Sequence, residues 1–145
     1  MADAPRGSAV EEVKVSNENE MIETVRRLLD RYINHESILP RDIVILTGRG
    51  LKRSPVYKAG RLGNFKLVGL EDRDKPNAVR IETLYRFKGL ESDIAIVCDI
   101  DRSEDHYKKE KLYVAASRAQ HVLAVVEYDV TEDAVTKPGG AESAA

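Results

Sequence analysis

Residues 94–99 read IAIVCD, a continuous apolar run that ends in an aspartate. A run without polar alternation is typical of a strand that is covered on both faces of its sheet. Two further runs have the same character, DIVILT at 42–47 and VLAVVE at 122–127. A helical pattern precedes DIVILT, and further helical patterns lie between DIVILT and IAIVCD and between IAIVCD and VLAVVE. The sequence therefore predicts an α/β domain with a mainly parallel sheet.

The remaining elements are predicted from periodicity and from capping residues. Asn17 and Glu20 stand at capping-box spacing, which marks a helix start, and this helix ends before Pro40. Apolar side chains then recur at helical intervals: Met21, Ile22, Val25, Leu28, Leu29, Tyr32 and Ile33. Further patterns predict a short helix at 54–59, strands at 65–70 and 79–84, and a helix at 107–118.

Length and composition indicate one globular domain. The chain has 145 residues, of which 42% are apolar and 33% charged, with a formal net charge of −2. We expect a flexible segment at 1–15, a domain at 16–130 and a disordered tail at 131–145. No run is long and apolar enough for a membrane span or a signal peptide, so we expect a cytoplasmic protein without membrane contact.

No metal site is predicted. Cys98 is the only cysteine, which excludes a disulfide framework and a multi-cysteine metal site. The histidines show no ligand spacing. Asp99 and Asp101 follow a buried run, where either a divalent ion or an ordinary acidic loop would fit, and we expect an acidic loop.

Residues 48–70 form a local basic segment in a chain that is acidic overall. They include six basic residues and no acidic one: Arg49, Lys52, Arg53, Lys58, Arg61 and Lys66. Such a segment can follow a nucleic-acid backbone, and Tyr57 with Phe65, or Tyr85 with Phe87, could stack on bases. A solvated loop with core aromatics would have the same composition, so the sequence leaves both interpretations open.

Two short segments of the sequence are candidates for a nucleotide-binding site. In FKGLE, at 87–91, a glycine turn follows a strand, so the backbone could approach a phosphate or a sugar. In YVAASRA, at 113–119, small residues surround Arg118, whose guanidinium suits a phosphate. Each phrase alone is equally compatible with a solvated turn or helix end. Because ligands of parallel sheets bind beyond strand ends, we expect these residues to gather at one edge.

A phosphate-binding loop of the form G-x-x-x-x-G-K-[ST] is absent from the sequence. In the segment GRLGNFK at 60–66, the two glycines and the lysine have the wrong spacing for such a loop, and no serine or threonine follows the lysine. We therefore expect that the chain alone does not hydrolyse a nucleotide in the manner of P-loop enzymes.

The order of three segments resembles the C-terminal part of UvrD/Rep-like superfamily 1 helicases. These segments are DIVILTGRG, VRIETLYRFKGLESDIAIVCDID and EKLYVAASRAQHVLAVV, within residues 41–128. The short spacing between Glu91 and Tyr113 is similar to the compact branch, which lacks a large inserted subdomain. The resemblance implies a RecA-like second motor domain, without a Walker A loop of its own.

The resemblance also implies roles for individual residues. Glu91 matches the motif V glutamate at the nucleotide sugar, with Gly89 and Lys88 in the same turn, and Arg118 matches the motif VI arginine at the γ-phosphate. Tyr85 stands where the family commonly has histidine, so its expected contact with DNA is stacking. Further expected nucleic-acid contacts are Thr47, Arg53, Lys58, Thr83 and Arg86, and Arg49 is expected at the nucleotide.

The activity so implied is that of half of an ATP-dependent DNA helicase or translocase. ATP with Mg²⁺ would be bound mainly by a partner N-terminal lobe carrying Walker A and B, and single-stranded DNA would cross both lobes. The isolated domain is expected to be inactive. The alternatives are a non-catalytic RecA-like interaction or regulatory module, and part of an RNA-directed or signalling NTPase.

Overall fold

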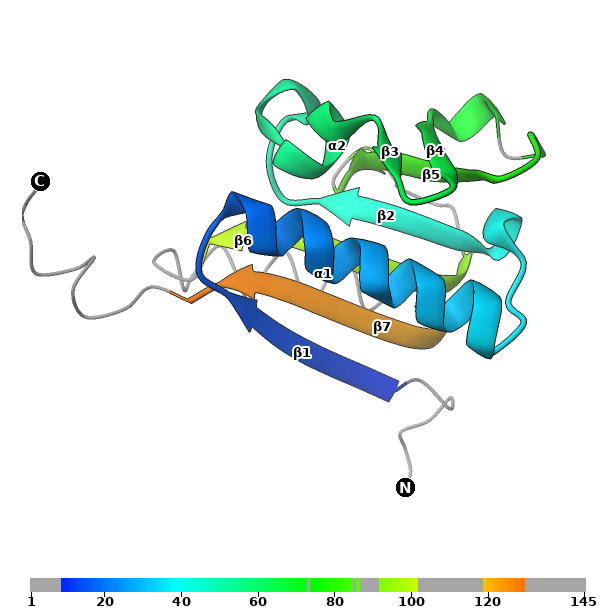
Figure 1. Ribbon diagram of the computed structural model, residues 1–145, viewed down its shortest axis with the longest axis horizontal. Coiled ribbons are helices and arrows are strands. Elements are labelled where there is room, and N and C mark those ends of the chain that lie inside the picture. The colour runs from blue at the N-terminus through cyan, green and yellow to red at the C-terminus, as the bar shows by residue number, and fades with distance from the viewer. Residues whose placement is uncertain (1–8, 73, 85, 87–91, 102–118, 130–145) are drawn as a thin grey trace, which may run out of the picture.

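The sheet is built around β2, β6 and β7, the three strands that the apolar runs predict. The computed structural model describes residues 9–72, 74–84, 86, 92–101 and 119–129. Its strands are β1 (Ala9–Val15), β2 (Ile43–Thr47), β3 (Arg61–Leu62), β4 (Phe65–Val68), β5 (Ala78–Thr83), β6 (Ser92–Asp101) and β7 (Ala119–Tyr128). Its α-helices are α1 (Glu18–Asp30) and α2 (Pro55–Ala59) (Figure 1). Short helical turns are η2 (Arg31–His35), η3 (Pro40–Asp42), η4 (Leu51–Arg53) and η5 (Leu70–Asp72).

All described strands belong to one sheet with the order β1-β7-β6-β2-β5-β4-β3. Every neighbouring pair is parallel except β3 and β4, which form an antiparallel hairpin. Gly63 lies in the two-residue turn of that hairpin at φ 62°, a left-handed conformation that glycine adopts at low cost. The predicted α/β class with a mainly parallel sheet is therefore confirmed.

Apolar side chains of the central strands are buried on both faces of the sheet. In β2, Ile43 and Ile45 face one cluster, whereas Val44 and Leu46 face the other, and all four are fully buried. β6 repeats this alternation, with Ile94 and Ile96 on the first side and Ala95 and Val97 on the second. Continuous apolar runs therefore mark strands that are covered twice, as predicted.

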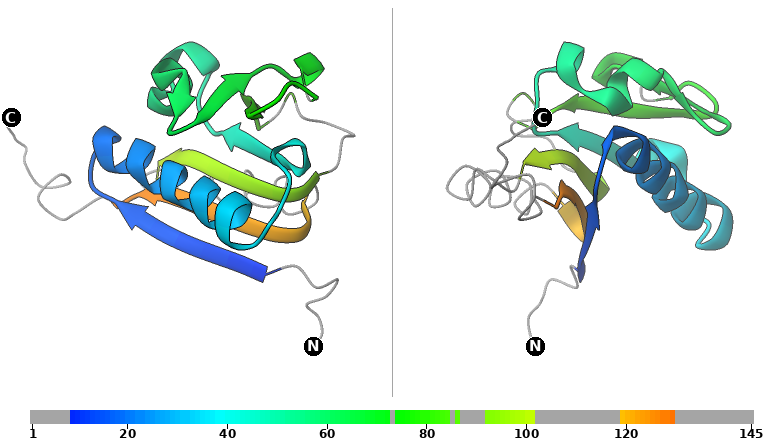
Figure 2. Two further views of the ribbon diagram at one scale, coloured as in Figure 1. Left: turned by 45° about the vertical axis from the view of Figure 1, so that its right-hand side comes forward. Right: turned by 60° about the vertical axis from the view of Figure 1, so that its left-hand side comes forward.

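Helix α1 packs along one face of the sheet (Figure 2). Asn17 caps its start, because the Asn17 side chain accepts a hydrogen bond from the Glu20 amide at 2.9 Å. The Glu20 carboxylate in turn accepts from the Ser16 amide at 2.6 Å, which completes a capping box shifted by one residue. Its buried face is the predicted one and includes Met21, Val25, Leu28, Leu29 and, in η2, Tyr32.

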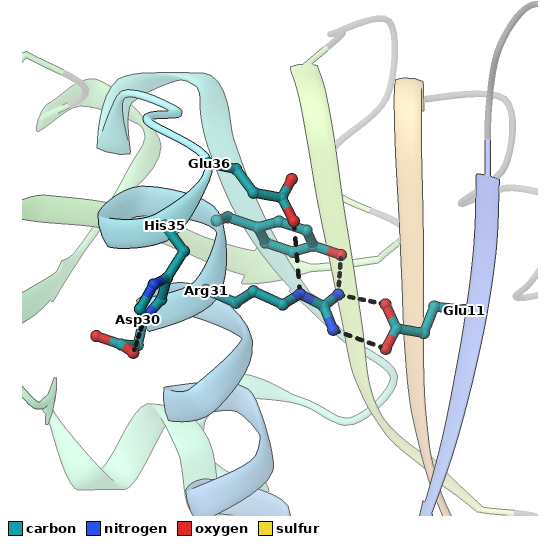
Figure 3. Close-up of polar contacts among 6 residues, drawn as sticks. Glu11, Asp30, Arg31, His35 and Glu36 are labelled. Atoms are coloured by element: carbon teal, nitrogen blue, oxygen red, sulfur yellow. Dashed lines mark hydrogen bonds and ion pairs between the residues drawn. The ribbon is translucent and has the colours of Figure 1, made fainter.

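An ion pair joins the end of α1 to the edge strand β1 (Figure 3). The Arg31 guanidinium binds both carboxylate oxygens of Glu11, with one Nη1–Oε2 distance of 3.1 Å, and lies over the Tyr32 ring. Arg31 Nε is also 3.7 Å from the Glu36 carboxylate. The hydrogen bond from Arg31 lowers the pKa of Glu11, although partial burial opposes this effect. This pair ties β1 to the helix across the sheet edge.

The N-terminal boundary differs from the predicted one. Residues 1–15 were expected to be flexible, yet Ala9–Val15 form β1, which pairs with β7 from Ala9↔Val122 to Val15↔Tyr128. AVEEVKV contains two glutamates and a lysine, and charged side chains of this kind are common on strands at a sheet edge. The expected helix at 107–118 and the tail at 131–145 lie outside the described residues. The division into domains stays a prediction.

Candidate functional site

The carboxyl ends of three parallel strands lie side by side. Thr47 at the end of β2 pairs with Thr83 of β5 on one side and with Cys98 of β6 on the other. The chain beyond β2 and β5 continues this pairing, since the Gly48 amide donates to the Cys98 carbonyl at 3.0 Å and the Leu84 amide donates to the Thr47 carbonyl at 2.9 Å. We call this the carboxyl edge. Ligands of parallel sheets bind at such an edge.

A bulge in β6 brings a carboxylate into the carboxyl edge. The pairing with β7 shifts between Val97 and Ile100, so an extra residue is accommodated there. Asp99 lies in this bulge at φ 61°, a left-handed conformation that aspartate tolerates better than most residues. Asp99 is 1% exposed, although we expected an acidic surface loop after the buried run. That expectation is wrong for Asp99, because β6 continues to Asp101.

The Asp99 carboxylate accepts hydrogen bonds from two hydroxyls that belong to different elements. Its Oδ2 atom is 2.6 Å from Thr47 Oγ1 and 2.6 Å from Ser54 Oγ. Its Oδ1 atom has no hydrogen-bond partner among the residues that the structure describes. All three residues are buried. The cluster Asp99, Thr47 and Ser54, which we call the Asp99 clamp, therefore fastens both ends of residues 48–53 to β6.

Each hydroxyl of the clamp also holds a backbone amide. Thr47 Oγ1 accepts from the Arg49 amide at 3.1 Å, and Ser54 Oγ accepts from the Tyr57 amide at 3.1 Å. Ser54 is thereby the N-cap of α2, whose first residue is Pro55. The clamp thus fixes the path of the chain that carries Arg49, Lys52 and Arg53.

Arg49 is held against the sheet rather than extended into solvent. Its guanidinium lies 4.9 Å from the centre of the Tyr128 ring and 3.8 Å from the Glu18 carboxylate, and its side chain is 29% exposed. Burial, followed by the charge of Asp99, raises the pKa of Tyr128 to about 12, and Arg49 opposes this shift. Burial, with Asp99 second, also raises the pKa of the Cys98 thiol, so this thiol stays protonated.

Thr83 and Arg86 lie at the end of β5. Thr83 is half-buried, and its hydroxyl accepts from the Arg86 amide at 3.3 Å. Arg86 is exposed, with its guanidinium 3.8 Å from the buried Glu82 carboxylate. Glu82 also accepts from the Thr83 amide at 2.9 Å. These contacts hold Arg86 next to Thr83, the residue that pairs with Thr47 at the carboxyl edge.

The six basic residues of 48–70 are distributed over two parts of the fold, the chain that follows β2 and the β3–β4 hairpin. Lys52, Arg53 and Lys58 are exposed on the chain that follows the carboxyl edge. Arg61 and Lys66 are also exposed, but they occupy opposite backbone positions in the β3–β4 hairpin. In the neighbouring strand, the backbone partner of Lys66 is Ala78, at the start of β5. Ala78 precedes Thr83 by five residues, which corresponds to about 16 Å along a strand.

Of the aromatic residues considered for stacking, Tyr57 is 41% exposed, whereas Phe65 is only 8% exposed and belongs to the core. The idea that Phe65 stacks on bases is therefore wrong. Tyr85 and Phe87 lie outside the described residues.

The residues expected at the nucleotide, apart from Arg49, lie outside the described residues; they are Lys88, Gly89, Glu91 and Arg118. Their neighbours in the chain are nevertheless informative. Glu91 precedes Ser92 and Arg118 precedes Ala119, and these two neighbours are paired at the amino ends of β6 and β7. Ser92 lies six residues before Cys98, about 20 Å from the carboxyl edge along the strand. Because Glu91 and Arg118 themselves lie outside the described residues, the expectation that they join the carboxyl edge stays a prediction.

Comparisons with known proteins agree with this architecture. The family model of the UvrD-like helicase C-terminal domain matches residues 78–126, a range that spans β5, β6 and most of β7. A similar solved structure is the C-terminal domain of a possible DNA helicase from Lactobacillus plantarum WCFS1. It aligns with a TM-score of 0.53 and 21% identity, over 84% of this chain and 74% of that chain. No curated protein matches.

The fold is thus of the α/β RecA-like class, in which parallel strands end at a ligand-binding edge. The resemblance to the UvrD/Rep-like helicases is confirmed over residues 78–126, which match the family model of the UvrD-like helicase C-terminal domain. Within the described part of the chain, no helix is long and apolar enough to cross a membrane.

Proposed function

We propose that this domain is the second motor lobe of an ATP-dependent DNA helicase or translocase. The observation that carries the proposal is the pairing of Thr47 with Thr83, which sets two strand ends next to the cationic chain of 48–54. The family match supports it independently, because residues 78–126 include the second of these strand ends. In this proposal the lobe provides part of a single-stranded DNA track and completes an ATP site.

On the DNA side, the phosphate backbone meets exposed cations at the carboxyl edge. Lys52, Arg53 and Lys58 have no ion-pair partner among the described residues, so their charges are free to replace the counterions of a phosphate chain. Arg86 adds a further charge at the end of β5. Thr47 is 1% exposed, so its proposed role is indirect: it holds the loop that carries the cations. Tyr85 is proposed to stack on a base.

On the nucleotide side, the proposed residues belong to chain next to the amino ends of β6 and β7. The pairing of Ser92 with Ala119 supports a shared location for Glu91 and Arg118. Glu91 would accept hydrogen bonds from the sugar, and Arg118 would bring a fixed positive charge to the γ-phosphate. ATP and Mg²⁺ are proposed to be held mainly by a separate lobe with the Walker A loop that this sequence lacks. Arg49 contacts Glu18 and Tyr128 at the carboxyl edge, about 20 Å along the strands from Ser92, so it does not fit the nucleotide contact expected of it in this arrangement.

Steady-state ATP hydrolysis tests this division of labour. When the domain is joined to an N-terminal lobe that carries Walker A and B, Arg118→Ala should lower kcat by about a thousandfold, as for other arginine fingers. Arg61→Ala, which removes an exposed cation from the β3–β4 hairpin, is the matched control and should leave kcat unchanged. An unchanged kcat for Arg118→Ala would instead favour a non-catalytic module.

A further inference from the structure

The Asp99 clamp is built at a point where the backbone departs from regular strand geometry. A regular β6 would direct residue 99 to the side of Val97, opposite Thr47 and α1, because side chains alternate along a strand. The bulge between Val97 and Ile100 and the left-handed φ of Asp99 turn the carboxylate toward Thr47 and Ser54 instead. Bulges and left-handed residues of this kind occur preferentially next to functional sites, where they redirect a side chain.

The clamp acts on one segment of chain. Thr47 precedes residues 48–53 and Ser54 follows them, and a single carboxylate oxygen accepts from both hydroxyls at 2.6 Å. Between these two points lie η4 and the exposed cations Lys52 and Arg53. Within the loop, the Gly48 amide donates to the Cys98 carbonyl at 3.0 Å and Leu51 packs against the core, whereas the described backbone hydrogen bond of the Arg53 amide is a local turn to the Gly50 carbonyl at 2.9 Å.

From this geometry we infer that Asp99 is a positioning residue for nucleic-acid binding: its buried carboxylate holds loop 48–53 in one path, so that Lys52 and Arg53 meet the phosphate backbone already ordered. Asp99 does not itself touch the nucleic acid, because its side chain is 1% exposed. A loop that is already ordered binds more tightly, because ordering a mobile loop or a long cationic side chain during binding costs free energy. The inference rests on the proposed function of the carboxyl edge.

Binding of a fluorescent single-stranded dT oligonucleotide by the 145-residue chain tests this role. Asp99→Asn keeps the size of the side chain and tolerates a left-handed φ, but removes the charge that both hydroxyls face. We expect binding that is about tenfold weaker at every salt concentration, with an unchanged salt slope, because the same cations still meet the phosphates. Asp99→Gly, which accepts the same φ, should behave alike if Asp99→Asn does not fold.

Two further measurements separate positioning from simple loss of stability. Hydrogen exchange should accelerate at the amides of Arg49 and Tyr57, because these amides donate hydrogen bonds to the hydroxyls of the Asp99 clamp. In a Lys52→Ala/Arg53→Ala background, Asp99→Asn should weaken binding no further, because its effect passes through those side chains. Glu12→Gln, an exposed carboxylate-to-amide change on β1, is the matched control and should alter neither readout.

The outcomes distinguish this inference from the proposed function. If folded Asp99→Asn binds the oligonucleotide as tightly as the wild-type chain, the positioning role is overturned while the proposed function stands. If the wild-type chain does not bind at low salt, the proposed DNA track fails and the positioning role fails with it. Weaker binding with a changed slope would mean that Asp99 alters the number of phosphate contacts, which also contradicts the inference.

Discussion

Removal of one buried hydroxyl should measure the strength of the clamp directly. Ser54 is fully buried, and its Oγ atom both accepts from the Tyr57 amide and donates to the Asp99 carboxylate. Loss of a helix N-cap costs about 1 kcal/mol. Loss of a hydrogen bond to a charged group costs about 1.5–3 kcal/mol. Because one hydroxyl serves both bonds, the two costs do not add fully, and Ser54→Ala should lower the free energy of unfolding by about 2–3 kcal/mol.

Urea denaturation followed by circular dichroism is the assay. The midpoint should fall while the slope with urea stays constant, since the surface exposed on unfolding hardly changes. Ser16→Ala is the matched control, because Ser16 is exposed and only its backbone amide is hydrogen-bonded among the described contacts; it should change stability by less than about 0.5 kcal/mol. A loss of similarly small size for Ser54→Ala would refute the clamp as a stabilising element.

Two other perturbations test the packing of α1. The pKa of Glu11 is lowered in the folded protein, so its pairing with Arg31 stabilises the fold above the ordinary glutamate pKa of about 4.3 and this contribution is lost as the pH falls through the lowered value. Glu11→Gln should therefore cost at most about 1 kcal/mol at pH 7, and less in acid or high salt; a difference that does not depend on pH would contradict the pairing. Leu29→Ala, at a fully buried site under α1, should cost about 3 kcal/mol in urea denaturation, against less than about 0.5 for exposed Leu39→Ala.

The predictable part of the fold is the part that hydrophobic periodicity determines. IAIVCD and DIVILT are buried on both faces because their apolar runs leave no polar face, and α1 begins at Asn17 because that side chain caps it. β1 was missed, because an edge strand exposes alternate residues and tolerates charges, so AVEEVKV lacks the signal of a central strand. The register of parallel strands also depends on contacts far apart in sequence, which no local pattern contains.

The candidate site was predictable only in its composition. The basic segment is evident in the sequence, but its division between the carboxyl edge and the β3–β4 hairpin follows from the pairing of Lys66 with Ala78. Asp99 had one signal, a carboxylate at the end of an apolar run, and this signal does not distinguish a surface loop from a buried acceptor. Its bulge and its two partners, which lie 52 and 45 residues away in sequence, are tertiary features.

The salt dependence of single-stranded DNA binding tests the central claim most directly. For the wild-type chain, log K should fall linearly with log salt, and Lys52→Ala/Arg53→Ala should reduce that slope by about 1.4, or about 0.7 for each lost phosphate contact. Arg61→Ala/Lys66→Ala removes the same charge from the hairpin, away from the carboxyl edge, and should leave the slope nearly unchanged. Equal slopes for the two double variants, or binding that does not respond to salt, would contradict a nucleic-acid track at the carboxyl edge.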